Sequence, residues 1–281
     1  MQKLLLLHGM ILLMGLNPLF AKLIDMPALS IIWGRLIFTS LSLFLVIKLF
    51  RKTSFRLTAS QFKWVIITGI CFGFHWWTYF QSIQFSTVAV GLCALFTYPI
   101  ITGVLEPMML GGKHKMIELL TGVLVTVGVI IIVPEWDFGN TTFLGILLGV
   151  ASAFLFSLRN IWGKKYLNAL SPDMTMFYQV LSGSILFLPF LTQFEFKPTG
   201  SDLGFLLLSG LLITPLSHTL LIKTFDYFSI KTVSVMTSLQ ILYSSIFAYL
   251  IFMEIPMIRT MIGGGIIFIA VVVETFWKKS P

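Results

Sequence analysis

Ten apolar segments, separated by short polar loops, make up almost the whole chain. They cover about residues 3–23, 28–50, 62–82, 87–110, 116–134, 142–163, 174–193, 202–222, 231–253 and 257–277. Each is close to the roughly 20 residues that carry a helix across the hydrocarbon core of a bilayer. Because a segment in lipid must satisfy its backbone hydrogen bonds internally, each is predicted to be a transmembrane helix. The expected fold class is an all-α integral membrane protein of ten helices without a soluble domain.

The composition excludes an ordinary soluble domain. Mean hydropathy is +0.95 and only 11% of residues are charged, whereas soluble domains carry about 25% charged residues. The net charge of +8 could indicate a nucleic-acid partner, but the basic residues lie in short loops, where a topology signal explains them. Cys71 and Cys93 lie inside apolar segments without metal-ligand spacing, so neither a disulfide framework nor a metal site is predicted.

Lysine and arginine are distributed unevenly between the two sets of loops. Three lie on the side opposite the N-terminus, namely Lys22, Lys197 and Arg259. Thirteen lie on the side of the N-terminus, namely Lys3, Arg51, Lys52, Arg56, Lys63, Lys113, Lys115, Lys164, Lys165, Lys223, Lys231, Lys278 and Lys279. Because basic loops stay in the cytoplasm, both termini are predicted to be cytoplasmic, in a plasma (bacterial inner) membrane.

The two halves of the chain show a weak internal repeat. With a shift of 142 residues the coinciding positions are Lys22 with Lys164, Tyr98 with Gln240, Thr102 with Ser244 and Gly122 with Gly264. Each half, 1–138 and 139–281, holds five segments, an odd number, so the second half is predicted to lie inverted relative to the first. Inverted repeats recur in secondary transporters, which bind solute near the bilayer midplane between the repeats.

Polar and aromatic residues interrupt several segments near mid-depth, where they are costly in lipid and indicate a solute pathway. The densest run is HWWTYF, residues 75–80, in which the first and fifth residues share one helical face. The candidate substrate-binding residues are Asn17, Arg35, His75, Trp76, Tyr79, Tyr98, Gln240 and Tyr243.

Each candidate also has a structural explanation. Arg35 either meets a substrate carboxylate or extends outward to water. His75 either binds solute or is satisfied by a neighbouring backbone carbonyl, and Trp76 either stacks on solute or fills the bundle interior. The pair Asn17 and Pro18 either frees a carbonyl for solute or only kinks the first helix.

Three further polar residues lie nearer to the cytoplasmic ends of their segments. Glu106 is a candidate proton-coupling carboxylate if burial raises its pKa; the alternative is an interfacial acid that faces Lys113 or Lys115. Arg159 is predicted to extend its side chain toward the cytoplasm. His218 is a weaker candidate for the cavity because it lies in the inner half of its segment.

Several short motifs are shared with a known family. They are GLNPLFAK at 15–22, Arg35, the proline-centred run 86–110, and Phe252 to Glu254 followed by Pro256 and Gly263-Gly264. With them, both halves of the chain resemble the ten-helix EamA branch of the drug/metabolite transporter superfamily. One departure is Gly112, where the family often has glutamate, so only the second half keeps the acid.

The resemblance implies a transporter that exports amino acids, related metabolites or drugs through a cavity lined by helices 1, 3, 4, 6, 8 and 9. The HWWTYF run resembles that of aromatic amino-acid exporters of the branch, which carry a histidine there. The sequence therefore predicts a secondary transporter that exports small organic metabolites, with amino acids favoured, by alternating access. The alternative is a broad-specificity drug efflux pump of the same fold, which would need a more apolar cavity and a carboxylate such as Glu106.

Other classes of protein find no support in the sequence. A nucleophile–base pair, a phosphate loop and an H-E-x-x-H pattern are all missing, so no enzyme activity is predicted. The expected partners are a small-molecule substrate and the lipid bilayer, without cofactor or nucleic acid. One chain could form a complete pathway from its two halves, so it is expected to function as a monomer.

Overall fold

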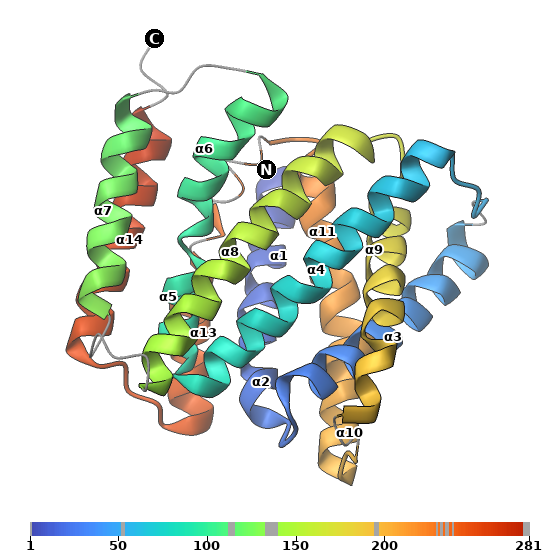
Figure 1. The fold of residues 1–281 in the computed structure, drawn as a ribbon, viewed down its shortest axis with the longest axis horizontal. Coiled ribbons are helices and arrows are strands. Elements are labelled where there is room, and N and C mark those ends of the chain that lie inside the picture. The colour runs from blue at the N-terminus through green and yellow to red at the C-terminus, as the bar shows by residue number, and fades with distance from the viewer. Residues whose placement is uncertain are drawn as a thin grey trace.

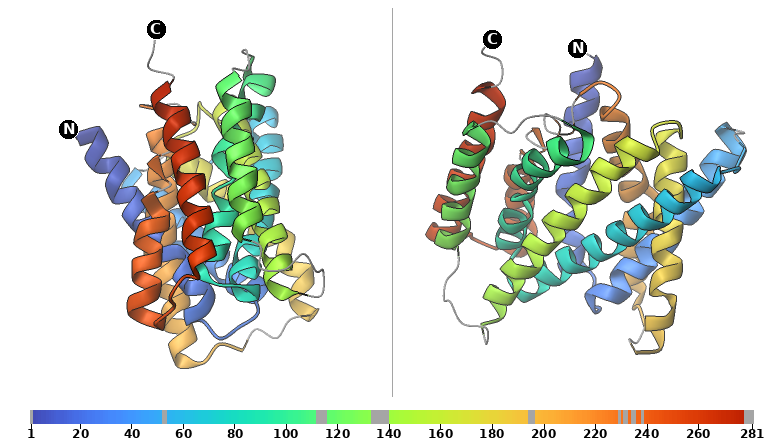
Figure 2. Two further views of the ribbon diagram at one scale, coloured as in Figure 1. Left: turned by 90° about the vertical axis from the view of Figure 1, so that its left-hand side faces the viewer. Right: turned by 45° about the horizontal axis from the view of Figure 1, so that its top comes forward.

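The computed structural model describes residues 2–51, 54–111, 116–132, 140–193, 197–228, 230, 233, 236, 237 and 239–277. Within these residues all regular secondary structure is helical, which confirms the all-α class. Figure 1 shows α4 (Ala59–Phe85) and α8 (Thr141–Tyr166) side by side across the middle of the bundle. The pair α7 (Met116–Ile132) and α14 (Ile258–Trp277) stands at one edge in Figures 1 and 2.

The remaining helices complete the bundle around these two pairs. Before residue 139 they are α1 (Gln2–Leu16), η1 (Asn17–Leu19), α2 (Phe20–Leu23), α3 (Ala28–Val46), η2 (Ile47–Arg51), α5 (Val88–Leu95) and α6 (Tyr98–Leu110). After it they are α9 (Pro172–Phe187), η3 (Leu188–Gln193), α10 (Gly200–Leu207), η4 (Leu208–Ile213), α11 (Thr214–Thr224) and α13 (Leu239–Phe252). Each of the ten predicted segments overlaps one of these helical stretches.

Five helical stretches of the described residues are long and apolar enough to cross a membrane. They are Leu5–Leu23, Ala28–Arg51, Val88–Leu110, Thr141–Tyr166 and Gly200–Thr224. Shorter apolar helices cover Leu120–Ile131, Leu239–Phe252 and Ile258–Ala270. Large apolar side chains stand exposed on many of the helices, which suits contact with lipid and not with water. The chain is an integral membrane protein.

A proline breaks the first long helix and frees a carbonyl that another helix uses. Pro18 has no N–H, so it cannot bond to the carbonyl of Met14 four residues earlier. Gln240 Nε2, from α13, donates to that carbonyl at 3.0 Å. The break at Asn17 and Pro18 therefore ties the first helix to α13 near the centre of the bundle.

Pro215 has the same effect at the junction of η4 and α11. Its missing N–H leaves the carbonyl of Leu211 free, and Ser42 Oγ of α3 donates to it at 2.8 Å. One turn away, Thr39 Oγ1 donates to the carbonyl of Gly210 at 2.9 Å. Two hydroxyls of α3 thus satisfy backbone groups of the π-helical turn, as a segment that spans a membrane requires.

Glycines allow the closest helix contacts around α4. A Cβ on Gly69 would stand 2.6 Å from Ser182 Cβ and 2.7 Å from the carbonyl oxygen of Gln179, both in α9. A Cβ on Gly149 of α8 would stand 2.5 Å from Ala94 Cβ of α5 and 3.0 Å from Ser82 Oγ of α4. Small residues that bring helix backbones together are the usual packing device in membranes, and here they fix α4 against its neighbours.

Candidate functional site

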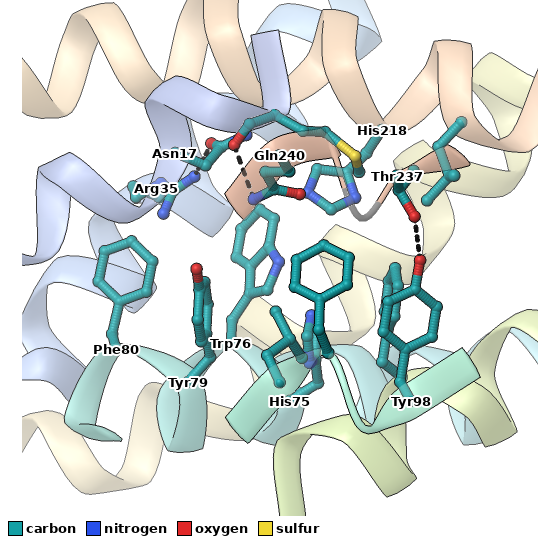
Figure 3. A pocket seen from close by; sticks show the side chains of 15 residues that line it. Asn17, Arg35, His75, Trp76, Tyr79, Phe80, Tyr98, His218, Thr237 and Gln240 are labelled. Carbon is teal, nitrogen blue, oxygen red and sulfur yellow. Dashed lines mark hydrogen bonds between the residues drawn. The ribbon is translucent and has the colours of Figure 1, made fainter. Parts of the chain in front are cut away.

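A small cavity lies inside the bundle, enclosed by side chains from α1, η1, α3, α4, α8, α11, α13 and the break between α5 and α6. Figure 3 shows α4 presenting four side chains to it: His75, Trp76, Tyr79 and Phe80. The space open to water is about 40 Å³, which holds one or a few water molecules. A solute of metabolite size can enter only if the lining moves apart.

Arg35 brings a permanent positive charge to this cavity. Its side chain is 1% exposed, and its Nη2 donates to Asn17 Oδ1 and to Thr214 Oγ1, each at 2.6 Å. The guanidinium carbon lies 4.6 Å from the ring centre of Trp76 and 4.7 Å from that of Phe80. The outward extension to water, one of the two explanations open from the sequence, is therefore wrong.

Several polar atoms of the cavity lining have no hydrogen-bond partner within the described part of the chain. They are Nε and Nη1 of Arg35, the hydroxyl of Tyr79 and Nδ1 of His218. The lining contains no aspartate or glutamate among the described residues. A buried polar group without a partner costs about 1–3 kcal/mol, and a charged one more. The lining therefore suits a polar guest, and an anionic group complements Arg35.

His75 is held by α8 through Ser152. Its Nδ1 lies 3.1 Å from the carbonyl oxygen of Ser152 and 2.7 Å from Ser152 Oγ. A carbonyl oxygen can only accept, and the hydroxyl proton of Ser152 is donated to the carbonyl of His75 at 2.8 Å. Nδ1 must therefore carry a proton, which leaves Nε2 of a neutral ring as an acceptor. The ring also stacks on Phe156 at 4.5 Å between centres.

Tyr98 and Gln240, which coincide in the internal repeat, both lie in the lining. The hydroxyl of Tyr98 hydrogen-bonds to Thr237, a contact drawn as a dashed line in Figure 3. The Tyr98 ring packs edge-on against Phe156 at 5.1 Å between centres. Both residues therefore join segments that are more than 130 positions apart in the chain.

Seven of the eight candidate substrate-binding residues line this cavity, namely Asn17, Arg35, His75, Trp76, Tyr79, Tyr98 and Gln240. The eighth, Tyr243, lies outside the lining, and its Cβ would be 3.0 Å from a Cβ on Gly15 of α1. Glu106 is half-buried in α6 and also lies outside the lining. A carboxylate at that position does not face the cavity in this conformation.

His218 lines the cavity as closely as the predicted residues do. Its ring lies edge-on to Phe72 at 5.1 Å and to Trp76 at 5.2 Å between centres. The repeat shift of 142 residues places it on Trp76, a predicted cavity residue, so the internal repeat holds a signal that depth along the segment hides. Helix periodicity gives no such signal for Phe80 and Phe156, which also line the cavity.

Arg159 does not extend toward the cytoplasm, so that prediction is wrong. The side chain is 1% exposed. Nε and Nη2 donate to Gln179 Oε1 at 2.9 and 2.6 Å, and Nη1 donates to Asn160 Oδ1 at 2.8 Å. Two neutral amides therefore hold this guanidinium inside the bundle.

Comparison with known proteins identifies the family. The model of the EamA-like transporter family matches residues 1–133 and again residues 143–276. A curated relative, the "S-adenosylmethionine uptake transporter" of Rickettsia felis (strain ATCC VR-1525 / URRWXCal2), is 26% identical over 213 residues, 74% of this chain and 69% of the relative. An "Uncharacterized transporter" of Clostridium kluyveri (strain ATCC 8527 / DSM 555 / NBRC 12016 / NCIMB 10680 / K1) is 29% identical over 137 residues, 44% of each chain.

The fold itself also has a counterpart among solved structures. One solved chain, described as "Crystal structure of protein", superposes with a TM-score of 0.75 at 15% identity over 99% of this chain and 97% of its own. That identity supports a shared fold and nothing finer. The family match covers nearly the whole chain and confirms the resemblance seen in its motifs; the protein is a transporter, not an enzyme, and belongs to the EamA-like transporter family.

Proposed function

We propose that the chain is a secondary transporter for small organic solutes of the amino-acid class. The solute binds in the central cavity through its carboxylate, which pairs with Arg35. Two five-helix halves, inverted relative to each other, rock about this site and expose it to one side of the membrane at a time. The proposal also includes ten spans, cytoplasmic termini in a bacterial inner membrane, and a functional monomer.

The match of one family model to both halves supports the repeat. So do the paired positions in the lining, where Tyr98 coincides with Gln240 and Trp76 with His218. In inverted-repeat transporters the solute site lies where the two repeats meet. Side chains from both matched regions line the cavity, as alternating access between two repeats requires.

The single observation that carries the solute class is the surroundings of Arg35. The guanidinium is buried, its hydrogen-bond partners Asn17 and Thr214 are neutral, and two of its nitrogens have no partner among the described residues. A planar guanidinium with free N–H groups binds a carboxylate in a bidentate geometry. Around it, the rings of Trp76, Tyr79 and Phe80 offer apolar surface for the remainder of the solute.

The named relative takes up S-adenosylmethionine, a molecule that itself carries an amino-acid carboxylate. This agrees with the solute class but points to uptake, whereas the sequence resemblance implies export. We propose export, with transport assays in both directions as the test. Drug efflux of cations is the weaker candidate, because Arg35 repels a cation and the described lining holds no carboxylate to bind one.

The experiment is a flux assay in proteoliposomes that contain the purified full chain. The panel pairs each amino acid with a relative that lacks the carboxylate: phenylalanine with phenethylamine, and tyrosine with tyramine. S-adenosylmethionine and the lipophilic cation tetraphenylphosphonium complete it. We expect saturable flux of at least one carboxylate-bearing solute and none of its amine partner. Flux of the cation alone, or equal flux of both members of a pair, would overturn the proposal.

A further inference from the structure

A second pocket lies at the end of α8 that carries Lys164, on the side predicted to be cytoplasmic. It is bounded by the end of α8, the turn that follows, the start of α9 and the end of α11. Its space open to water is about 200 Å³, against about 40 Å³ for the central cavity. This pocket is therefore the larger of the two and has room for a small organic molecule.

Arg159 lies at the floor of this pocket with Gln179 and Asn160. All three line the pocket, and none is more than 2% exposed. Among the described residues the guanidinium donates only to amide oxygens and, at 3.7 Å, to the sulfur of Met176. Amide oxygens are neutral acceptors that orient the guanidinium without cancelling its charge, so the floor of the pocket remains electropositive.

Two further features of the pocket favour a polar, anionic guest. Thr175 lines the pocket, and its buried hydroxyl oxygen Oγ1 has no hydrogen-bond partner within the described residues. Lys164 brings a second positive charge, while Asp226 is the single acid of the described lining. The pocket therefore offers two cations against one anion, together with a buried hydroxyl that is available to a ligand.

The ring of Phe72 separates this pocket from the central cavity. It is fully buried and lies 4.7 Å from the guanidinium carbon of Arg159. The Phe72 ring also packs against three residues of the central lining: His75 at 6.1 Å, Trp76 at 4.4 Å and His218 at 5.1 Å between ring centres. One aromatic side chain thus touches the linings of both sites.

Shifts close to that of the internal repeat relate the two arginine–amide pairs, but the arginine and the amide lie on opposite helices of the pair in the two halves. A shift of 142 places Asn17 on Arg159, and a shift of 144 places Arg35 on Gln179. In the first half the amide on the first helix accepts from the arginine on the second. In the second half the arginine lies on α8 and the amide on α9. The same arginine–amide pair therefore occurs once in each half.

We propose that the second pocket is an anion-binding site in which Arg159, Lys164 and Thr175 hold the carboxylate of an organic solute. This second binding site would lie on the side of the Phe72 ring that is predicted to face the cytoplasm, and it is distinct from the central site at Arg35. The inference rests on the proposed transport function for its role, but the binding that it predicts is measured without transport. The competing source of an anionic group is a lipid headgroup.

The test uses a cysteine reporter in the pocket and a matched pair of small probes. Asn168→Cys, at an exposed position of the pocket lining, is made in a background of Cys71→Ala and Cys93→Ala, and the full chain is placed in phosphatidylcholine nanodiscs. The rate of labelling by an anionic methanethiosulfonate is measured with millimolar benzoate or with benzamide, its neutral isostere. Ser60→Cys, an exposed position at the start of α4 outside the pocket, is the matched control.

We expect benzoate to slow labelling at position 168 about fivefold, as it would when free ligand exceeds Kd about fourfold, and benzamide to leave the rate unchanged. Ser60→Cys should show no effect. Arg159→Gln should abolish the protection, whereas Arg35→Gln, which removes the proposed central site, should retain it. Failure of central binding and failure of this pocket are thereby told apart.

A second measurement does not depend on an arginine variant that folds. With Arg159 intact, the anionic reagent should label position 168 about tenfold faster than its trimethylammonium analogue, because a cationic cleft concentrates anions. Equal rates for the two reagents, or equal protection by benzoate and benzamide, would overturn the proposal. Protection by phosphatidylglycerol in the nanodisc without any effect of benzoate would also overturn it, in favour of a lipid headgroup.

Discussion

The protein buries two arginines in the same bundle and satisfies them differently. Arg159 uses Nε, Nη1 and Nη2, all of which donate to amide oxygens. Arg35 uses only Nη2, while Nε and Nη1 have no partner among the described residues. A buried charge is retained only if its surroundings compensate the cost of removing it from water. The comparison separates an arginine that amides of the fold hold in place, with its charge not neutralised, from one that keeps two nitrogens without a partner among the described residues.

The largest effect is expected from Arg35→Gln. This change removes the charge that pairs with the solute, and it relieves a buried cation that the fold compensates only in part. Transport should fall by about 100-fold, since a hydrogen bond to a charged group contributes about 1.5–3 kcal/mol. The melting temperature should change little. Flux in proteoliposomes and a thermal melt of the same preparation measure both quantities.

The matched control for that variant is Lys48→Gln, an exposed cation at the end of the same long helix. It should leave flux unchanged. If Arg35→Gln lowers the melting temperature as strongly as it lowers flux, then Arg35 is structural and the contrast with Arg159 fails.

Arg159→Leu should show the opposite balance. It leaves the side-chain oxygens of Gln179 and Asn160 without their donor in a buried site, at a cost of about 1–3 kcal/mol each. The melting temperature should fall by about 5–10 °C. Arg159→Lys keeps the charge and one donor nitrogen with three N–H groups, so it should recover part of the loss. An unchanged melting temperature in Arg159→Leu would show that the amides do not depend on this arginine.

Tyr79→Phe sharpens the description of the central cavity. The Tyr79 hydroxyl has no partner in the described residues, so its removal should leave the melting temperature unchanged or slightly raised. A neutral hydrogen bond to solute contributes about 1 kcal/mol, so KM should rise about fivefold. Concentration-dependent flux gives KM. A KM equal to that of the unaltered protein would place the hydroxyl outside the solute contact.

The smallest effect is expected from Thr175→Val in the second pocket. Valine has nearly the same shape, and the hydroxyl that it replaces has no protein partner in the described residues. Stability should therefore be unchanged, while the concentration of benzoate needed to protect a cysteine at Asn168 from labelling should rise about threefold. Lower stability instead would mean that the hydroxyl serves packing and not a ligand.

Apolar length and periodicity predicted the helices because lipid forces every spanning backbone to bond to itself. Polar residues at mid-depth predicted most of the central lining for a related reason: only a cavity makes them tolerable in a membrane. These rules are local, and they hold whatever the neighbouring helices are. They do not determine the direction in which a side chain points, so they predict Tyr243 among the binding residues although it packs on α1.

By itself, the sequence determined the membrane class, the helical segments and the polar stripe on α4, since each follows from the cost of exposing polar groups to lipid. The tertiary structure alone decided which partner satisfies each buried group. Gln240 could be assigned to the carbonyl freed by Pro18 only when the bundle closed over 226 positions of chain. The hydrogen-bond partners of Arg35 and Arg159 also depend on the tertiary structure, because a guanidinium binds whichever acceptor the neighbouring helix brings within reach.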